Sequence, residues 1–341
     1  MKLFFRIVAI AISIILSLVI LFYFWAGSSQ YSESDYSQIV DYKKPVITST
    51  DTLTLISYNI GYLSAMYNNR ATQIPESAFT ENLSNAIDSL SAYQPDIIAF
   101  QEIDFHSNRS YYVNQMDEIA KALNFPNGAM AVNWDKRYLP FPYWPPSVHY
   151  GEMLSGQAVL SRFKLINNER FILKSVEDRP FWYRHFYLDR LLQISKLKVN
   201  AKDILIANVH LEAFQLNTRV AQARQIVEKL KPYRDQALIL IGDFNAISQK
   251  QLHSGEYPKE IVDSYRDDDT IDYIKSELSF SEAVPDSVTD LAIQFSFSSE
   301  KPHLHIDHIF FDERQFERID WRIIHATASD HFPLYLKLLL R

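Results

Sequence analysis

Residues 7 to 25, "IVAIAISIILSLVILFYFW", form an apolar run without a single charged side chain. As an α-helix this run spans roughly 28 Å, which is close to the thickness of the hydrocarbon core of a bilayer. A cleavable signal peptide has a shorter apolar region, of about 7–15 residues, and a small-residue cleavage site. The residues that follow the run, "WAGSSQ", do not form such a site. The pattern therefore favours an uncleaved membrane anchor over residues 1–26, with a signal sequence as the alternative.

The charges beside this run predict its orientation. Lys2 and Arg6 precede it, whereas Glu33 and Asp35 follow it. Because positive flanks stay on the cytoplasmic side, we expect a single-pass membrane protein with its N-terminus in the cytoplasm. The rest of the chain would then lie in the periplasm or outside the cell, and would be secreted if residues 1–26 were removed.

Beyond residue 50 the hydrophobic pattern is that of a mixed α/β (α+β) domain. Apolar positions at helical spacing predict three helices, at 80–96, 113–123 and 217–231. Alternating or continuous apolar stretches predict strands at 52–61, 95–104, 157–166, 191–199, 203–214, 237–246, 302–312 and 329–340. Many strands with few helices between them favour packed sheets covered by helices over a regular alternation of strand and helix.

The chain divides into an anchor, a linker and one domain. Residues 27–49 are rich in Ser, Tyr and Asp, a composition typical of a linker. No repeat and no second linker follows, so residues 50–341 are predicted to form a single domain. With 47 % hydrophobic residues in 341, the chain is able to bury a large core.

Charge limits the class of partner. Without Lys2 and Arg6 the chain has 32 basic against 41 acidic residues, a net charge of −9. This balance argues against a broad basic face that binds duplex nucleic acid regardless of sequence. It does not exclude chemistry on a phosphodiester, because bound divalent cations can supply positive charge locally.

Several predicted strands end or begin in side chains that bind hard cations or move protons. The set is Asn59, Glu102, His210, Asp243, Asn245, Asp307, Asp330 and His331. Singly, each match is weak, because a turn, a solvated strand end or a hydrogen-bonded core position is the commoner explanation of such a residue. Several carboxylates at one rim, however, repel one another unless a cation neutralises them. Because the set is rich in oxygen and the chain lacks cysteine, Mg²⁺ or Mn²⁺ is favoured over a thiolate zinc site.

The segments that carry these residues occur in a characteristic order. They are "SYNIG", "AFQEID", "LSRF", "NVHLE", "GDFNA", "HIDHIFF" and "SDHFPL". As a set, over residues 52–341, they resemble the endonuclease/exonuclease/phosphatase superfamily of metal-dependent phosphoesterases, which includes deoxyribonuclease-like and sphingomyelinase-like members. The resemblance implies a four-layered α/β sandwich, in which two β-sheets lie face to face with helices outside.

The resemblance also implies a role for each residue in hydrolysis of a phosphodiester by in-line attack of water. Glu102, with Asn59 and Asp330, would hold the divalent cation. Asp243 would orient or deprotonate the water, and Asn245 would donate to the phosphate. His331 would contact a phosphate oxygen while Asp307 fixes its tautomer. His210 would assist the leaving group, and a histidine at this position is unlike the abasic-site endonuclease branch, which has tyrosine there.

Three features remain open to two interpretations. The spacing of His303, His305 and Asp307 suits zinc, but structural or phosphate-facing histidines are favoured. Arg109 either contacts an anionic substrate or forms an ordinary salt bridge. The aromatic segments 137–151 and 179–190 either cover the sandwich or form a lid, a base-stacking surface or a membrane contact.

The substrate class stays open as well. A membrane anchor suits a lipid phosphodiester, such as sphingomyelin or a phosphoinositide-related lipid, whereas an exported nuclease needs the same catalytic core. A third possibility is a tethered module that binds phosphorylated ligands without turnover, which the complete set of expected residues disfavours. No protein partner is inferable.

Overall fold

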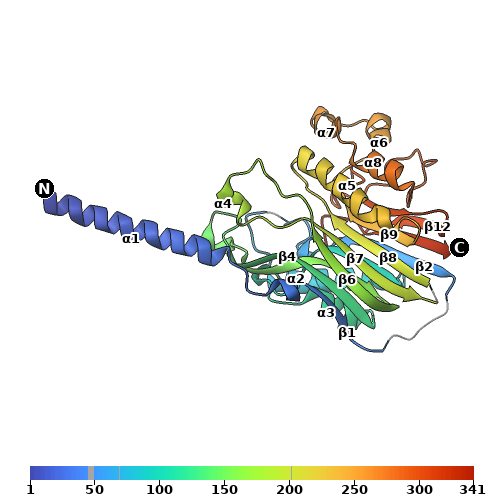
Figure 1. The fold of residues 1–341 in the computed structure, drawn as a ribbon, viewed down its shortest axis with the longest axis horizontal. Coiled ribbons are helices and arrows are strands. Elements are labelled where there is room, and N and C mark those ends of the chain that lie inside the picture. Colours follow the sequence, from blue (N-terminus) through green and yellow to red (C-terminus); the bar gives the residue numbers. More distant parts are fainter. Residues whose placement is uncertain (45–49, 69, 201) are drawn as a thin grey trace.

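The computed structural model of the chain describes residues 1–44, 50–68, 70–200 and 202–341. In these residues two β-sheets lie face to face, and helices cover their outer faces (Figure 1). The four-layered α/β sandwich implied by the family resemblance is thereby confirmed. Helix α1 (Lys2–Ala26) projects away from the sandwich (Figure 1).

Both sheets are mixed, and in each one a parallel pair is flanked by antiparallel strands. The first sheet has the order β1 (Ser37–Asp41), β4 (Asn127–Leu139), β5 (Gly151–Ser161), β3 (Ile97–Asp104), β2 (Thr52–Asn59), β13 (Leu334–Leu340), β12 (Phe316–Ile323). The second has the order β10 (Ser281–Glu282), β11 (Asp307–Phe311), β9 (Ala237–Asp243), β8 (Lys202–His210), β7 (Leu191–Val199), β6 (Lys164–Ile172). The parallel pairs are β2–β3 and β8–β9.

Helices pack on both outer faces. Helices α2 (Glu76–Ser91) and α3 (Gln115–Ala122) cover the first sheet, and α5 (Leu216–Leu230) and α8 (Thr270–Leu278) cover the second. Shorter helices are α4 (Phe181–Arg184), α6 (Gln249–Ser254) and α7 (Lys259–Tyr265). Single 3₁₀ turns occur at Glu33–Asp35, Gly61–Leu63, Asn108–Ser110, Pro146–Val148 and Lys231–Tyr233.

Strands that are apolar on both faces explain the layers. In β3, Ile97 and Ala99 point into the core between the sheets, whereas Ile98 and Phe100 point into the core beneath α2 and α3. Because successive side chains of a strand face opposite ways, a continuous apolar run buries one set on each side. The apolar runs that predicted the strands are therefore what holds the layers together.

Strand direction brings the polar strand ends to one edge. Strands β2 and β3 are parallel, so Asn59 and the end of β3 lie at the same edge of the first sheet. Strands β8 and β9 are also parallel, and His210 pairs with Asp243 in register. Strand β11 runs antiparallel to β9 and begins there, with Asp307 opposite Asp243. Asn59 also accepts at its backbone oxygen from Ser329 Oγ, 270 residues away in sequence, so distant segments meet at this edge, which we call the active edge.

One expected strand and the expected linker differ in kind from those observed, and the strands expected at 302–312 and 329–340 begin only at Asp307 and Leu334. The strand expected at 157–166 is divided, because β5 ends at Ser161 in the first sheet and β6 begins at Lys164 in the second. Ser161 Oγ accepts from the backbone N–H of Phe163 at 3.0 Å and so stabilises a turn between the sheets. Within the expected linker 27–49, residues Ser37–Asp41 form β1 and pair with β4, so this part belongs to the first sheet. Residues 45–49 of that linker lie outside the described part of the chain.

One helix in the described residues, α1, is long and apolar enough to cross a membrane. A signal sequence near an N-terminus has the same properties, so the anchor and the signal sequence both stay as interpretations of residues 1–26.

Close packing of β8 against β9 requires glycine at position 242. Its φ is +149°, and a Cβ atom there would lie 2.0 Å from Val209 O, a backbone atom that cannot move aside. We predict that Gly242→Ala lowers the free energy of unfolding by about 2 kcal/mol or more. Gly255→Ala is the control, because a Cβ at Gly255 meets only the movable side chains of Tyr257 and Leu291. Denaturant unfolding measures both variants, and an equal effect of the two would contradict this reading.

Candidate active site

Asp243 lies at the centre of the active edge and is only 1 % exposed. Its Oδ2 accepts from Asn59 Nδ2 at 2.9 Å, and its Oδ1 accepts from the backbone N–H of Asn245 at 2.9 Å. The Nε2 atoms of His210 and His331 lie 3.5 and 3.8 Å from Oδ2. Four of the predicted residues, from both sheets, therefore surround one buried carboxylate.

A second carboxylate fixes His331. Asp307 Oδ2 lies 2.9 Å from His331 Nδ1. Burial works against a charged imidazole, but Asp307 and Asp243 raise the pKa of His331 to about 10. The ring is thus cationic at neutral pH, with Nδ1–H donating to Asp307 and Nε2–H on the side of Asp243. Burial raises the pKa of Asp243 to about 7, with the charge of His331 opposing that rise and Asp307 adding to it.

Glu102 and Asp330 form the acidic side of the site. Glu102 lies at a bulge, where the pairing of β3 with β5 skips from Phe100 to Ile103, and its φ is +51°. Bulges re-aim side chains, and a left-handed non-glycine residue is strained. Asn68 Nδ2 lies 3.2 Å from Glu102 Oε2 and 3.3 Å from both carboxylate oxygens of Asp330. Both carboxylates therefore lie within hydrogen-bonding distance of a single nitrogen atom.

This donor set fits a hard divalent cation. Burial and the nearby charge of Asp330 raise the pKa of Glu102, and the positive charges of Arg109, His331 and Arg190 offset that rise only in part. Asn68 Oδ1 is buried and has no hydrogen-bond partner among the described residues. Two carboxylates beside an unpaired amide oxygen are ligands that Mg²⁺ and Mn²⁺ prefer. Glu102 and Asp330 are accordingly the residues that would hold the ion.

His210 joins the acidic side to Asp243. Its Nε2 lies 3.8 Å from Glu102 Oε1, in addition to its contact with Asp243. Burial and the positive charges of Arg190 and His331 hold the pKa of His210 well below its ordinary value. His210 is therefore a neutral imidazole beside a cationic one, and the two histidines are able to play different roles.

The two asparagines have partners at the active edge. Asn59 Oδ1 accepts from Gly61 N–H at 3.1 Å while its amide donates to Asp243, so its contact with a metal stays a prediction. Asn245 has a φ of +50°, and its Nδ2 donates to Leu211 O at 3.0 Å. All eight residues predicted from the strand ends thus meet at one edge.

Arg109 forms a buried salt bridge with Asp104, which is one of the two roles that the sequence left open for it. It donates to Asp104 from Nε at 3.0 Å and from Nη2 at 2.8 Å, and both side chains are buried. Its guanidinium stacks on Tyr62 at 3.6 Å and on Tyr150 at 4.9 Å. Tyr62, Arg109 and Tyr150 line a pocket together with His149, so contact of this group with a substrate stays a prediction.

Sequence reasoning missed Asn68 and Arg190. Asn68 lies in a loop without periodicity, so no pattern singled it out. Arg190 immediately precedes β7, which starts at the active edge because it is antiparallel to β8. The Arg190 side chain is 5 % exposed, its Nε lies 3.5 Å from Glu212 Oε2, and its Nη1 has no hydrogen-bond partner among the described residues. Its position at the start of a strand at the active edge was the signal available in the sequence.

The sequence model of the endonuclease/exonuclease/phosphatase family matches residues 56–331, which include all eight predicted site residues. The chain belongs to the endonuclease/exonuclease/phosphatase family. Membership makes it a phosphoric ester hydrolase of a family that depends on divalent metal ions.

Solved structures of the family share the fold at low sequence identity. The human Nocturnin catalytic domain with bound sulfate anion is 17 % identical, with a TM-score of 0.60 over 92 % of this chain and 100 % of that chain. A Bacteroides thetaiotaomicron mannosyl-6-phosphatase is 18 % identical, with a TM-score of 0.56 over 84 % and 100 %. D. rerio TDP2 complexed with a single strand DNA product is 14 % identical, with a TM-score of 0.54 over 85 % and 99 %. No curated protein sequence matches this chain.

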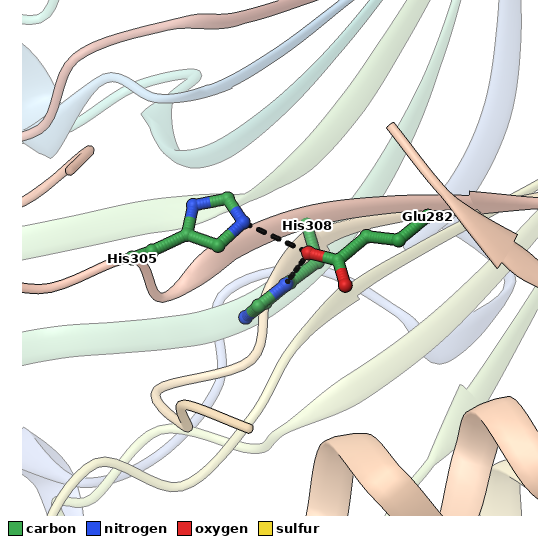
Figure 2. Close-up of side chains that lie close together, drawn as sticks. All are labelled: Glu282, His305 and His308. Carbon is green, nitrogen blue, oxygen red and sulfur yellow. Dashed lines mark hydrogen bonds and ion pairs between the residues drawn. The ribbon is translucent and has the colours of Figure 1, made fainter. Parts of the chain in front are cut away.

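A second buried cluster lies next to the active edge. Figure 2 shows the imidazoles of His305 and His308 pointing at one carboxylate oxygen of Glu282. His305 Nε2 and His308 Nδ1 each lie 2.8 Å from Glu282 Oε1. His308 Nε2 also donates to Ala246 O at 2.9 Å, and so ties the cluster to the chain that follows Asn245.

The zinc spacing of His303, His305 and Asp307 does not produce a site. Asp307 points to His331, and His303 Nδ1 contacts Lys301 O at 2.7 Å. In the neighbouring cluster both imidazoles contact the same oxygen of Glu282 at hydrogen-bond distance. His305 instead joins His308 and Glu282 in a group whose ligand atoms are close enough to hold a metal ion, so the choice between metal-binding and structural or phosphate-facing histidines stays a prediction.

Glu282 gives this cluster a measurable pH dependence. Burial opposes its ionisation, but His308 and His305 hold its pKa well below the ordinary value of 4.5. A carboxyl whose pKa is lowered by folding stabilises the fold above its unfolded pKa, and that contribution is lost as the pH falls.

We therefore predict that Glu282→Gln lowers the free energy of unfolding by about 2–4 kcal/mol at pH 6, because one partner of a buried charged cluster is lost. The deficit should shrink as the pH falls below 4.5. Urea unfolding between pH 6 and pH 4 measures it, with Glu228→Gln on the exposed face of α5 as the control. A deficit that is independent of pH would show that Glu282 is not held as a carboxylate.

Proposed function

We propose that the chain is a divalent-metal-dependent phosphodiesterase that cleaves its substrate by in-line attack of water. The observation that carries this proposal is the convergence of Asp243, His331, Asp307, Glu102 and Asp330 at one edge, with complementary charges and protonation states. Catalysis in such a site is mainly a matter of position and electrostatics, and no covalent intermediate is needed.

Asp243 is the proposed acceptor of the water proton. Its pKa of about 7 makes its carboxylate basic enough to take a proton at neutral pH. Asn59 and the backbone of Asn245 donate to its two oxygens and so fix its orientation. One N–H of the Asn245 side-chain amide donates to Leu211 O, so the other is available to donate a hydrogen bond to a phosphate oxygen of the substrate.

His331 is the proposed donor to a phosphate oxygen. Asp307 holds its Nδ1–H, so the cationic ring presents Nε2–H on the side where Asp243 would hold the water. Neutral His210 is then available to assist the leaving group. Arg190, with its unpaired Nη1, adds a fixed positive charge beside Glu102 and His210.

The cation, Mg²⁺ or Mn²⁺, would be held by Glu102 and Asp330, with Asn59 and Asn68 nearby. When bound, it would polarise a phosphoryl oxygen and stabilise the negative charge that develops on phosphate. Its positive charge would also offset the repulsion between the two carboxylates.

For the whole chain we propose a single-pass protein anchored through residues 7–25, with its N-terminus in the cytoplasm and its catalytic domain outside. The flanking charges of the apolar run support this orientation. Nucleic acid and phospholipid head groups are both phosphodiesters that this catalytic core suits, and a sphingomyelinase-like or phosphoinositide-directed activity is the alternative to a nuclease.

We predict that Asp243→Asn and His331→Gln each lower turnover of bis-nitrophenyl phosphate by about a hundredfold or more, because general base and electrostatic contributions are lost. Chelation of divalent metal should abolish turnover by the unaltered protein. The control is Asp235→Asn, an aspartate whose side chain is 78 % exposed. Circular dichroism establishes that the variants remain folded, and full turnover in either site variant would refute the assignment.

A further inference from the structure

Large aromatic side chains are exposed in two loops at the active edge. Strand β5 is antiparallel to both β3 and β4, so the loop after β4 leaves from the edge at which β3 carries Glu102. Strand β7 is antiparallel to β8, so the segment before β7 lies at the edge at which β8 ends in His210. Tyr143 and Trp144 belong to the first of these loops, and Phe181 and Trp182 to the second.

These four side chains are unusually accessible for residues of their size. Trp144 is 77 % exposed, Phe181 70 %, Tyr143 55 % and Trp182 51 %. Strand β4, which leads into the first loop, is tied to the second loop by a hydrogen bond of 2.8 Å from Trp134 Nε1 to Phe186 O. A single exposed aromatic needs no explanation, but a group of them in adjoining loops indicates a contact surface.

The apolar helix α1 ends beside β4 and the second loop, which contains α4 (Figure 1). The Tyr23 ring stacks on His185 with their centroids 4.3 Å apart, and Tyr23 O lies 3.2 Å from His185 Nε2. Phe22 packs on Tyr138 at the end of β4, at 5.8 Å between ring centroids. Contacts with the end of β4 and with the second loop therefore fix where the apolar helix leaves the domain.

The place where α1 leaves the domain indicates what contacts these exposed aromatic side chains. If α1 crosses a bilayer, the head-group region lies at its end, which is where the two loops are. Tyr and Trp favour this region, because their rings are apolar while their N–H and O–H groups still reach water. We infer that Tyr143, Trp144, Phe181 and Trp182 form a membrane-contact surface, which we call the aromatic rim, and that its partner is the lipid bilayer.

The aromatic rim has a consequence for the substrate. It lies at the active edge, so contact with the bilayer turns the catalytic residues toward the membrane surface. If the chain has the proposed phosphodiesterase activity, on which this step rests, its substrates are the phosphoesters of lipid head groups. A nuclease that acts on polymers in solution has no need of this orientation.

Because the chain contains no cysteine, single spin labels can test the contact directly. Trp144→Cys and Trp182→Cys are labelled in the full chain reconstituted into phosphatidylcholine vesicles. Lys164→Cys is the control, since it is exposed and begins β6 at the opposite edge. Labels at 144 and 182 should be relaxed by oxygen, which partitions into lipid, and the label at 164 by an aqueous nickel chelate. Aqueous behaviour of both rim labels would overturn the inference.

Activity provides the second measurement. The double variant Trp144→Ser/Trp182→Ser should hydrolyse bis-nitrophenyl phosphate at the rate of the unaltered chain, but should cleave sphingomyelin or phosphatidylinositol in vesicles several-fold more slowly. Equal rates on vesicles would overturn the assignment of lipid as the substrate class. If the unaltered chain hydrolysed neither the soluble nor the lipid substrate, the proposed catalytic function would fail, while the spin labels would still decide whether the rim contacts the membrane.

Discussion

Four carboxylates, those of Glu102, Asp243, Asp307 and Asp330, are held together at the active edge, largely out of water. Such a group is unstable unless positive charge and hydrogen-bond donors are placed among its members. Within the described residues, His331 supplies the charge between Asp243 and Asp307. Glu102 and Asp330 both contact the neutral amide of Asn68, and no Lys or Arg of the described residues forms an ion pair with either, so the charges of Arg109 and Arg190 offset the repulsion only in part. This imbalance is the physical reason for expecting a cation beside Glu102, and the proposed chemistry depends on it.

The packed layers of the sandwich stabilise the fold enough to hold these carboxylates together. Apolar faces on both sides of β2, β3, β8 and β9 hold the strands in fixed register, so their polar ends cannot drift apart. The bulge at Glu102 and the left-handed backbone of Asn245 then direct individual side chains. Stability resides in the layers, and these two left-handed positions lie at the edge that carries the chemistry. The same edge carries the aromatic rim, so the fold links catalysis with the place where α1 leaves the domain.

Apolar periodicity and polar strand ends are local signals, so the sequence pattern predicted packed sheets covered by helices and the eight edge residues, while the four layers were implied by the family resemblance. It could not predict β1, since Ser37–Asp41 becomes a strand only by pairing with β4, ninety residues away. The division of 157–166 depends on a turn that Ser161 makes between the two sheets, and continuous apolarity conceals it. Asn68 lies in a loop and Arg190 precedes a strand, so neither belongs to an apolar pattern or follows a predicted strand. Their part in the site is therefore visible only in the three-dimensional structure. Glu282 escaped notice because its partners, His305 and His308, are more than twenty residues away in the sequence.

Anomalous diffraction from crystals of the protein grown with Mn²⁺ tests the central claim most directly. The account predicts an anomalous manganese peak at coordinating distance from carboxylate oxygens of Glu102 and Asp330. The same peak should be absent from crystals of Glu102→Gln. A peak at Glu282, His305 and His308 instead, or no peak at the active edge in the unaltered protein, would contradict it.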